Sequence, residues 1–505
     1  MLNYFTLRSI IKSTRRRECI PCTTLLVGKN ASYDGSTLIA RNDDSQSTRF
    51  TPKKLAVIHP EQQKREHETV LSHLKIQLPD NPMRYTAMPN ALKGEGIWAA
   101  SGINEAEVAM TATETITSNP RVLGADPLVE YDEETNTPGG IGEEDIVYLV
   151  LPYIHSAREG VLRLGSLLEK YGTYEMNGIA FSDHDEIWWL ETIGGHHWIA
   201  RRVPDDAYVV MPNQLGIDTF DLKDAFTTKE NHLCSDDLKE FIEKNHLCLN
   251  LDDSFNARYA FGSHDDSDHV YNTPRDWFIR RYLNPRTYKW DGENADFTPF
   301  SDDIPWTMVP ERKITVEDVK YALSTHFQNT PYDPYITRGD LSNKGALRPV
   351  GINRNDFLSV LQVRQGQEPI EWFTFGSNVF NTLVPLYIHI DTVPEYYSNT
   401  TGEVSTDNFY WANRLIGAMA DACDKQSAIH IERYQRVVQS HSHHIIHTYD
   451  ELIEKETDEA RKTELRHEAN QKAADMLKKE TSKTLHLVLD ELSFTMKNKF
   501  ACSDA

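Results

Sequence analysis

Cysteine is scarce in this chain, whose 505 residues include six: Cys19, Cys22, Cys234, Cys248, Cys423 and Cys502. Domains that depend on disulfides carry a much denser framework. No CxxC pair is followed by a second CxxC or an HxxxH pair at the spacing of a structural zinc site, so that pattern is missing too. The sequence therefore predicts reduced thiols, a cytoplasmic location and no bound metal.

Long apolar runs are also lacking. No segment reaches the roughly 18 apolar residues that a membrane span requires. The apolar residues between Leu2 and Ile11 are interrupted and precede the basic cluster Arg15–Arg17, whereas a secretory signal places its charges first. Because residues 1–21 are basic with few acids, an amphipathic targeting helix stays open as the alternative to the cytoplasm.

Positive charge is in deficit, with a formal net charge of -23. Since residues 1–21 are basic, the acidic excess lies in the remainder, which makes nucleic acid and anionic membranes poor partners. The motifs GxxxxGK[ST] and GxSxG are absent. Gly139–Gly142 follow an acidic loop rather than a strand, which disfavours phosphate binding. No organic cofactor is predicted.

The order of predicted elements indicates an α+β protein. Strand-like runs occupy Thr23–Val27, Ser36–Ala40, Lys54–His59, Leu74–Leu78, Arg84–Met88 and Val108–Thr113. A helical period covers 146–168, strands return at Ile187–Leu190, His197–Arg201 and Tyr208–Met211, and about 408–500 is helical. This order suits packed sheets with helices outside them.

The segment Cys22–Asp44 carries the clearest chemical signal. A strand begins at Cys22, turns at Tyr33–Gly35, and returns to end at Arg41-Asn42-Asp43-Asp44. The returning strand places Arg41 close to Cys22, where a guanidinium favours the thiolate. Asp43 or Asp44 can then orient Arg41 or bind an amine. Spacing alone leaves a second interpretation open, a buried structural cysteine beside an unrelated ion pair.

Several motifs in order make the chain resemble the dipeptidase A family of cysteine peptidases, whose mature N-terminus reads Cys-Thr-Thr. Besides Cys22–Asp44, these motifs are Gly102–Glu105, Thr113–Thr115, Gly139–Glu143, Asn213-Gln214, Tyr271–Arg275 and Arg348–Arg354. The family belongs to the N-terminal-nucleophile (Ntn) hydrolases. The related choloylglycine and penicillin V acylases share the spacing of Arg41 and Asp44.

The resemblance implies a four-layer αββα sandwich with a helical C-terminal portion. It also implies a leader at residues 1–21, a catalytic domain at 22–400, and helices at 401–505 packed on the same unit. Removal of the leader makes Cys22 the first residue and the nucleophile, with its own α-amine as base. The further site residues implied are Arg41, Asp44, Asn104, Asn213 and Arg275, with Asn104 and Asn213 as oxyanion donors. The expected substrates are dipeptides.

Residues 1–21 depart from the family pattern, because they form a longer leader than is usual and Pro21 directly precedes the nucleophile. Self-cleavage by thiol attack on the Pro21 carbonyl, trimming by another protease and a different translation start are all open. Cys19 is the weaker nucleophile candidate, since no family motif follows it.

Two other functions stay open. A related Ntn amidase would act on acylated amino acids with the same machinery, whereas a secernin-like protein would work through partners with an inert or unprocessed Cys22. The amphipathic pattern at Leu485, Val488, Leu489 and Leu492 suits either a homo-oligomer or a cover for the core.

Two further clusters carry weaker hypotheses. His441, His443, His444 and His447 lie on one predicted helix but lack the carboxylate of an HExxH motif, so a solvated helix face is favoured over a metal site. The acidic loop 126–145, with Asp132, Glu133 and Glu134, is predicted to be solvated; alternatively, it borders the pocket and meets a substrate ammonium.

Overall fold

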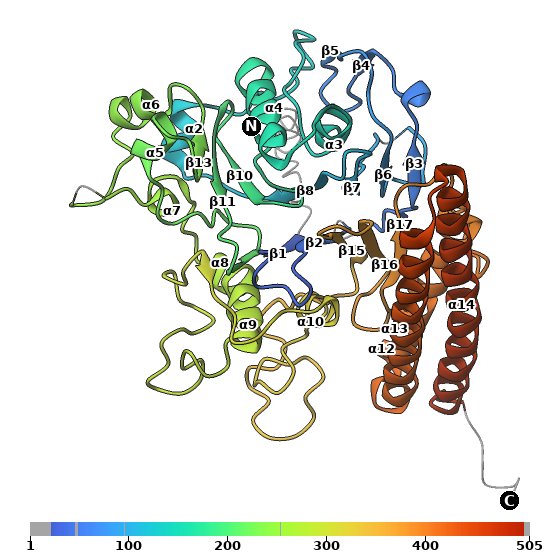
Figure 1. The fold of residues 1–505 in the computed structure, drawn as a ribbon. Coiled ribbons are helices and arrows are strands. Elements are labelled where there is room, and N and C mark those ends of the chain that lie inside the picture. Colours follow the sequence, from blue (N-terminus) through green and yellow to red (C-terminus); the bar gives the residue numbers. More distant parts are fainter. Residues whose placement is uncertain (1–21, 46–48, 95, 253, 499–505) are drawn as a thin grey trace, which may run out of the picture.

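A computed structural model describes residues 22–45, 49–94, 96–252 and 254–498 (Figure 1). The predicted leader, with Cys19 and Pro21, lies outside the described residues. The fold is α+β, with antiparallel sheets and a helical C-terminal part.

The first sheet has seven strands in the order β14-β12-β1-β2-β15-β16-β17. Their bounds are Cys22–Val27 (β1), Thr37–Asp44 (β2), Tyr208–Met211 (β12), Thr307–Met308 (β14), Asn355–Val363 (β15), Ile370–Phe375 (β16) and Val384–Tyr387 (β17). The predicted hairpin is confirmed as β1 and β2, paired from Cys22↔Asp43 to Val27↔Leu38. In its loop Gly35 has a φ of 84°, a conformation that favours glycine.

The second sheet has six strands in the order β13-β11-β10-β9-β8-β7. They are Ser101–Ile103 (β7), Ala109–Thr115 (β8), Asn177–Ser182 (β9), Ile187–Ile193 (β10), His197–Arg202 (β11) and His232–Cys234 (β13). Two small ribbons pair Ala56–Ile58 (β3) with Tyr85–Ala87 (β6), and Glu66–Glu68 (β4) with Lys75–Gln77 (β5).

Alternation along β1 and β2 decides which side chains lie between the two sheets. Leu26 and Ile39 join a core with Ala180, Trp189 and other residues of the second sheet. Leu25 and Leu38 point the other way, into a core shared with helices. Because strand side chains alternate between faces, every second residue of β2 faces the second sheet.

Helices cover the outer faces of both sheets (Figure 1). Those at Ile146–Val150 (α3) and Ala157–Tyr171 (α4) pack on the second sheet. Thr273–Leu283 (α9) and Val316–Ala322 (α10) pack on the first. The predicted continuous helix over 146–168 is wrong: Pro152 lies in a 3-10 turn, Leu151–Tyr153 (η2), between α3 and α4. Proline cannot donate the backbone bond that a continuing helix needs.

Short helices occupy many of the connections between strands. They are Pro60–Gln62 (η1), Pro120–Ala125 (α2), Leu222–Phe226 (α5), Leu238–Lys244 (α6), Ala257–Phe261 (α7), Asp268–Tyr271 (α8) and Glu395–Ser398 (α11).

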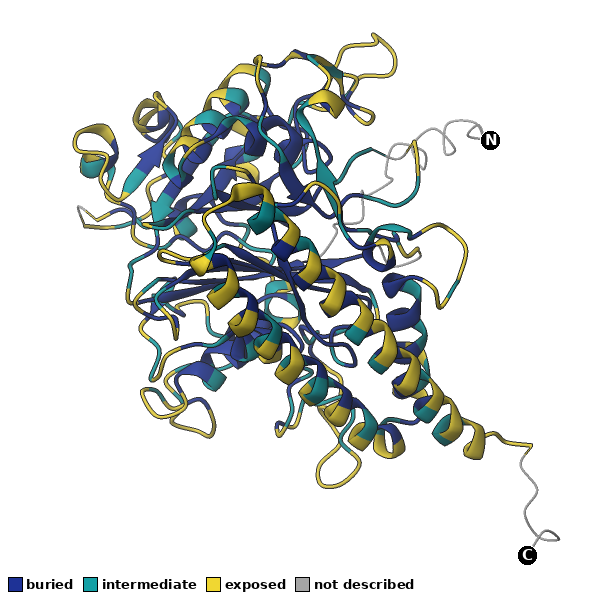
Figure 2. Cartoon of the chain, turned by 45° about the vertical axis from the view of Figure 1, so that its right-hand side comes forward, coloured by how far each residue is buried: buried dark blue, intermediate teal, exposed yellow. Residues whose placement is uncertain are grey.

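The helical C-terminal part consists of Phe409–Ala422 (α12), Asp424–Lys455 (α13) and Glu459–Phe494 (α14). Tyr434, Val438 and Leu477 share a core cluster with Phe373 and Leu386 of the first sheet. Figure 2 shows the long helices with exposed outer faces and buried residues toward the sheet. None of the helices in the described ranges has the length and apolar character needed to cross a membrane.

Candidate active site

The N-terminal end of β1 is where most of the site residues expected from the sequence meet. Cys22, the first residue of β1, is fully buried. The strand register sets Cys22 opposite Asp43 and Thr24 opposite Arg41. All four have the parity of Leu26 and Ile39, so they lie on the face toward the second sheet.

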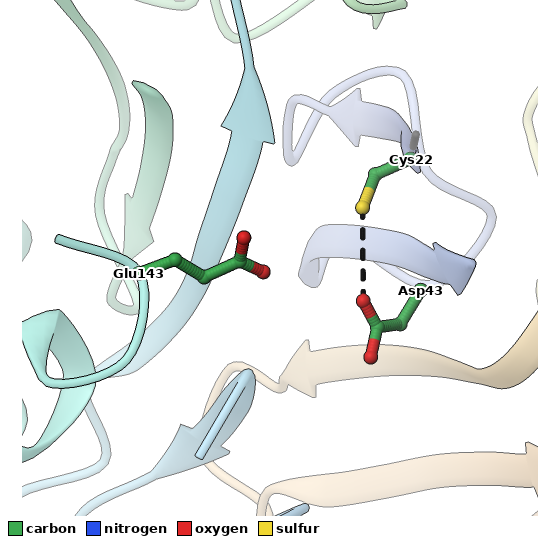
Figure 3. A group of neighbouring side chains, drawn as sticks. All are labelled: Cys22, Asp43 and Glu143. Carbon is green, nitrogen blue, oxygen red and sulfur yellow. Dashed lines mark hydrogen bonds between the residues drawn. The ribbon is translucent and has the colours of Figure 1, made fainter. Parts of the chain in front are cut away.

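Arg41 connects the nucleophile candidate to two carboxylates. Its Nη2 donates to Cys22 Sγ at 2.9 Å, to Asp43 Oδ1 at 3.1 Å and to Glu143 Oε1 at 2.7 Å. Figure 3 shows the Glu143 carboxylate directed toward the Cys22–Asp43 pair from another segment of the chain. Arg41 Nη1 and Nε are buried and have no hydrogen-bond partner among the described residues.

Asp43 is held in its charged form. Lys53, which is also buried, places Nζ 3.2 Å from Asp43 Oδ2. Burial raises the pKa of the Asp43 carboxyl, but Lys53 and Arg41 outweigh burial, so this pKa lies below its ordinary value. Asp43 Oδ1 also accepts from the thiol of Cys22 at 3.7 Å. An ionised acceptor is therefore in place for the thiol proton.

The thiol itself is neutral in this state. Burial raises the pKa of Cys22 well above its ordinary value, although Arg41 opposes the effect. Burial likewise raises the pKa of Glu114 to about 8, against Arg41 and Arg275. Glu114 accepts from Thr24 Oγ1 at 2.8 Å. A nucleophilic thiolate consequently needs a base that removes its proton during attack.

The backbone of Cys22 is anchored by two of the predicted residues. Cys22 N donates to Asn213 Oδ1 at 3.2 Å, and Arg275 Nη1 donates to the carbonyl oxygen of Cys22 and to Thr23 Oγ1. Arg275 Nη2 also donates to Asn213 Oδ1 at 2.8 Å. Asn213 Nδ2 donates to the Thr115 carbonyl at 3.0 Å and lies 3.4 Å from Glu114. Asn213 therefore contacts the backbone nitrogen of Cys22 directly.

Asp44 lies on the opposite face of β2 from Cys22. Its carboxylate accepts from Arg348 and from Asn355 Nδ2. Burial raises the pKa of Asp44 above its ordinary value, while Arg348 and Asn355 oppose the effect. Alternation explains the difference, since residues two apart share a face of a strand and residues three apart do not. The structure thus brings Asp43, not Asp44, to the thiol.

The side-chain amide of Asn104 forms hydrogen bonds with backbone groups close to it. Its Nδ2 donates to the carbonyls of Leu151 at 2.8 Å and Ile154 at 2.7 Å. Its Oδ1 accepts from the N–H groups of Ala106 and Val108, both at 3.0 Å. Both amide hydrogens are therefore committed to holding the turn after β7. An oxyanion role for Asn104 would require one of these two hydrogen bonds to break.

Glu143, Glu114 and Lys53 are site residues that sequence reasoning did not select. Glu143 and Glu114 stand inside two of the family motifs, which was the available signal. The sequence holds no comparable signal for Lys53. In the acidic loop, Asp132 and Glu134 are exposed and hydrogen-bonded within their own turn, whereas Glu143, later in the same loop, accepts from Arg41 beside Cys22.

One group of described residues has the geometry of a metal site. Cys22, Asp43 and Glu143 each offer a ligand atom within 4.8 Å of the others. Arg41 Nη2 already lies within hydrogen-bonding distance of all three, so a cationic group fills that position. In the predicted histidine cluster, His443 pairs with Glu317 and His447 with Glu451.

Comparison with known proteins shows that this chain is similar to a family of peptidases over most of its length. The model of peptidase family C69 matches residues 21–437. A protein of Bifidobacterium longum (strain NCC 2705) named "Dipeptidase" is 53% identical, covering 96% of this chain and 99% of its own. "Probable dipeptidase A" of Streptococcus pyogenes serotype M3 (strain SSI-1) is 51% identical over 96% and 100%. "Dipeptidase A" of Lactobacillus helveticus is 43% identical over 93% and 96%.

Proposed function

The chain belongs to peptidase family C69 and is a peptide-bond hydrolase, and from this premise we propose that it cleaves dipeptides with Cys22 as the nucleophile. The proposal rests on the position of Cys22, whose Sγ accepts a hydrogen bond from Arg41 and whose backbone N donates one to Asn213. The names of the relatives support the substrate class.

Removal of residues 1–21 supplies the base in this proposal. Cleavage before Cys22 turns its amide nitrogen into an α-amine, whose reference pKa of about 7.7–8.0 suits a base at neutral pH. Asn213 Oδ1 already accepts from this nitrogen and orients the amine. Because thiol and amine belong to one residue, no histidine is required.

Acylation then follows from these contacts. The α-amine takes the proton from Sγ, and the thiolate bonds to the scissile carbonyl carbon while Arg41 stabilises its charge. The second N–H of Asn213, which makes only the 3.4 Å contact with Glu114, turns to the oxyanion. When the C–N bond breaks, the leaving amine takes the proton from the Cys22 ammonium, which leaves a thioester.

Deacylation repeats the proton transfer with water. The α-amine removes a proton from a water molecule, whose oxygen attacks the thioester carbonyl. The C–S bond breaks, the released acid leaves, and the proton returns to Sγ. The cycle restores the thiol and the neutral amine and consumes one water for each peptide bond.

The arrangement of layers supports a finer fold assignment. We infer that the two facing sheets, with α3 and α4 outside one and α9 and α10 outside the other, form the αββα sandwich of Ntn hydrolases. A nucleophile at the start of a central strand between the sheets is consistent with that fold. The proposed boundaries stay at 1–21, 22–400 and 401–505.

A substrate panel tests this function directly. The processed protein is assayed with dipeptides, tripeptides and N-acylated amino acids, beside Cys22→Ser and the exposed-thiol control Cys248→Ser. We expect hydrolysis of dipeptides, a loss of at least about a thousandfold in kcat for Cys22→Ser, and unchanged activity for Cys248→Ser. Preference for N-acylated amino acids would favour the amidase, and no hydrolysis by processed protein would favour the secernin-like function.

A further inference from the structure

Two carboxylates from separate segments approach the proposed nucleophile. Asp43 comes from β2, and Glu143 comes from the turn between the Gly139–Gly142 segment and α3. Their oxygens and Cys22 Sγ all lie within 4.8 Å of one another, and both side chains are buried (Figure 3). Arg41 pairs with both carboxylates and Lys53 pairs with Asp43, which offsets the cost of burying the two acids. Negatively charged oxygen atoms are therefore held close to the thiol, within reach of a cationic group on a substrate.

The covalent geometry of a dipeptide places its ammonium group in this region. The ammonium nitrogen is bonded to the carbon next to the scissile carbonyl, about 2.5 Å from the carbonyl carbon. A thiol in position to attack lies about 3–3.5 Å from the same carbon. The ammonium therefore falls within about 6 Å of Sγ, the region that Asp43 and Glu143 occupy.

Asp43 and Glu143 differ in their partners and in the part of the chain that holds them. Asp43 has one oxygen on Arg41 and the thiol, and the other on Lys53. Glu143 contacts Arg41 from a different segment, which is held by hydrogen bonds outside a strand ladder: Ile141 N donates to Gly172 O, and Glu143 N donates to the side-chain Oε1 of Glu175. Glu143 therefore reaches Arg41 from a segment outside the first sheet, whereas Asp43 belongs to β2 of that sheet.

Unpaired donors beside these acids indicate where acceptor atoms of a ligand lie. Arg41 Nη1 and Nε are fully buried without a partner among the described residues. Unpaired buried donors are costly and uncommon in folded proteins. Buried acids next to unpaired N–H groups complement a zwitterion, which carries an ammonium and acceptor oxygens a few bonds apart.

We propose that Glu143, beside Asp43, binds the free α-ammonium group of the substrate, and that the unpaired N–H groups of Arg41 bind its oxygen atoms. This inference rests on the proposed dipeptidase function and deepens it, because it makes a free amino end a requirement for cleavage. An N-acylated or des-amino substrate lacks the positive charge that Glu143 binds in this proposal.

The test compares two substrates that differ only in the amino group, alanyl-alanine and propionyl-alanine. For the processed wild type we expect kcat/KM to favour alanyl-alanine by at least about a hundredfold. In Glu143→Gln this preference falls at least tenfold, chiefly through a higher KM for alanyl-alanine, and Glu143→Asp restores part of it. If propionyl-alanine is not cleaved, its inhibition constant against alanyl-alanine replaces its kcat/KM in the comparison.

The adjacent Glu144→Gln is the matched control. Glu144 is buried but accepts from the N–H groups of Val70 and Leu71, away from the thiol. We expect Glu144→Gln to keep the wild-type preference whatever its total activity. N-terminal sequencing of each variant verifies that processing is equal.

Three outcomes separate the possibilities. Equal loss of both substrates in Glu143→Gln would show that Glu143 only supports Arg41 and would overturn the inference. A wild type that does not distinguish the two substrates would also overturn it. Failure of processed wild type to cleave any dipeptide would instead refute the proposed function on which the inference rests.

Discussion

At the residue scale, the chemistry depends on which face of β2 a carboxylate occupies. Asp43 lies beside Cys22 and Arg41, while Asp44 pairs with Arg348 and Asn355 on the other face. The two neighbours therefore have separate roles. Asp43 holds charges at the thiol, and Asp44 holds the sheet against the segment that contains Arg348.

Asn substitutions distinguish these roles. In Asp43→Asn we expect kcat/KM of the folded enzyme to fall at least about a hundredfold, because Arg41 and Lys53 lose their shared counter-charge at the thiol. In Asp44→Asn the main effect is a loss of about 3–5 kcal/mol in the free energy of unfolding, because Arg348 is left unpaired. Steady-state kinetics and urea denaturation check both. A stable, inactive Asp44→Asn would contradict this assignment.

Glu114 makes stability depend on pH. Burial raises its pKa to about 8 from 4.5, so between these values the folded protein keeps a proton that the unfolded chain releases. The free energy of unfolding from this group therefore decreases as pH rises through that window. Glu114→Gln, which stays neutral, is expected to match the wild type near pH 5 and exceed it by at least about 1 kcal/mol at pH 8.

Thermal denaturation at the two pH values measures this difference, with the exposed Glu134→Gln as control. The control is expected to follow the wild type at both pH values. An equal loss of stability at pH 5 and pH 8 in Glu114→Gln would refute a neutral, buried Glu114.

Some site residues could be found from local sequence patterns, whereas others become visible only in the folded structure. Local pattern and family motifs selected Cys22, Arg41, Asn213 and Arg275, which the structure gathers within a few hydrogen bonds. Choosing Asp43 over Asp44 needed only the alternation of a strand. Lys53 reaches Asp43 through tertiary packing, which no local pattern encodes.

At the element scale, glycines in the Gly139–Glu143 segment allow the close approach that seats Glu143. A Cβ on Gly140 would lie 2.3 Å from the carbonyl oxygen of Gly172, which accepts from Ile141 N. That atom belongs to the backbone, so the segment itself has to move. The family motif at this place therefore has a packing reason as well as a chemical one.

Gly140→Ala tests this reason. We expect a loss of about 1–3 kcal/mol in stability from overpacking, together with a fall in kcat/KM as Glu143 moves away from Arg41. Gly124→Ala is the control, because its added Cβ meets nothing within 4 Å. Thermal denaturation and kinetics measure both variants; full activity in Gly140→Ala would contradict the role of this segment.

Most short strands and the C-terminal helices could be predicted, whereas strands β15 to β17 of the first sheet could not. The β1–β2 hairpin, the β10–β11 pair and the helices after residue 408 have strong local patterns and were confirmed. Strands β15 to β17 went unrecognised in a region that is otherwise rich in turns. β15 pairs with β2 from more than 300 residues away, and such pairing is set by the whole fold rather than by nearby sequence.

At the scale of the whole molecule, the helical C-terminal part completes the fold. Helix α14 contributes Leu477 to the cluster that covers β16 and β17, and Asn470 bonds both backbone groups of Tyr387. These contacts tie α14 to the first sheet, and the predicted boundary at residue 400 stays a prediction. The cytoplasmic location and the oligomeric state stay predictions.

The family assignment applies to most of the chain. The resemblance stated from six motifs is confirmed by the match to peptidase family C69 over residues 21–437. The proposed mechanism requires one covalent change in the chain, the conversion of the Cys22 amide nitrogen into an α-amine. Without it, the buried neutral thiol has no base on its own residue.

The most direct test is therefore the intact mass and N-terminal sequence of the purified protein, beside Cys22→Ala. We expect the wild-type protein to begin at Cys22. A variant that retains residues 1–21 would further identify self-cleavage as the route, and a trimmed variant would identify another protease. Wild-type protein that hydrolyses dipeptides while keeping residues 1–21 would contradict the central claim, because its Cys22 carries no free amine.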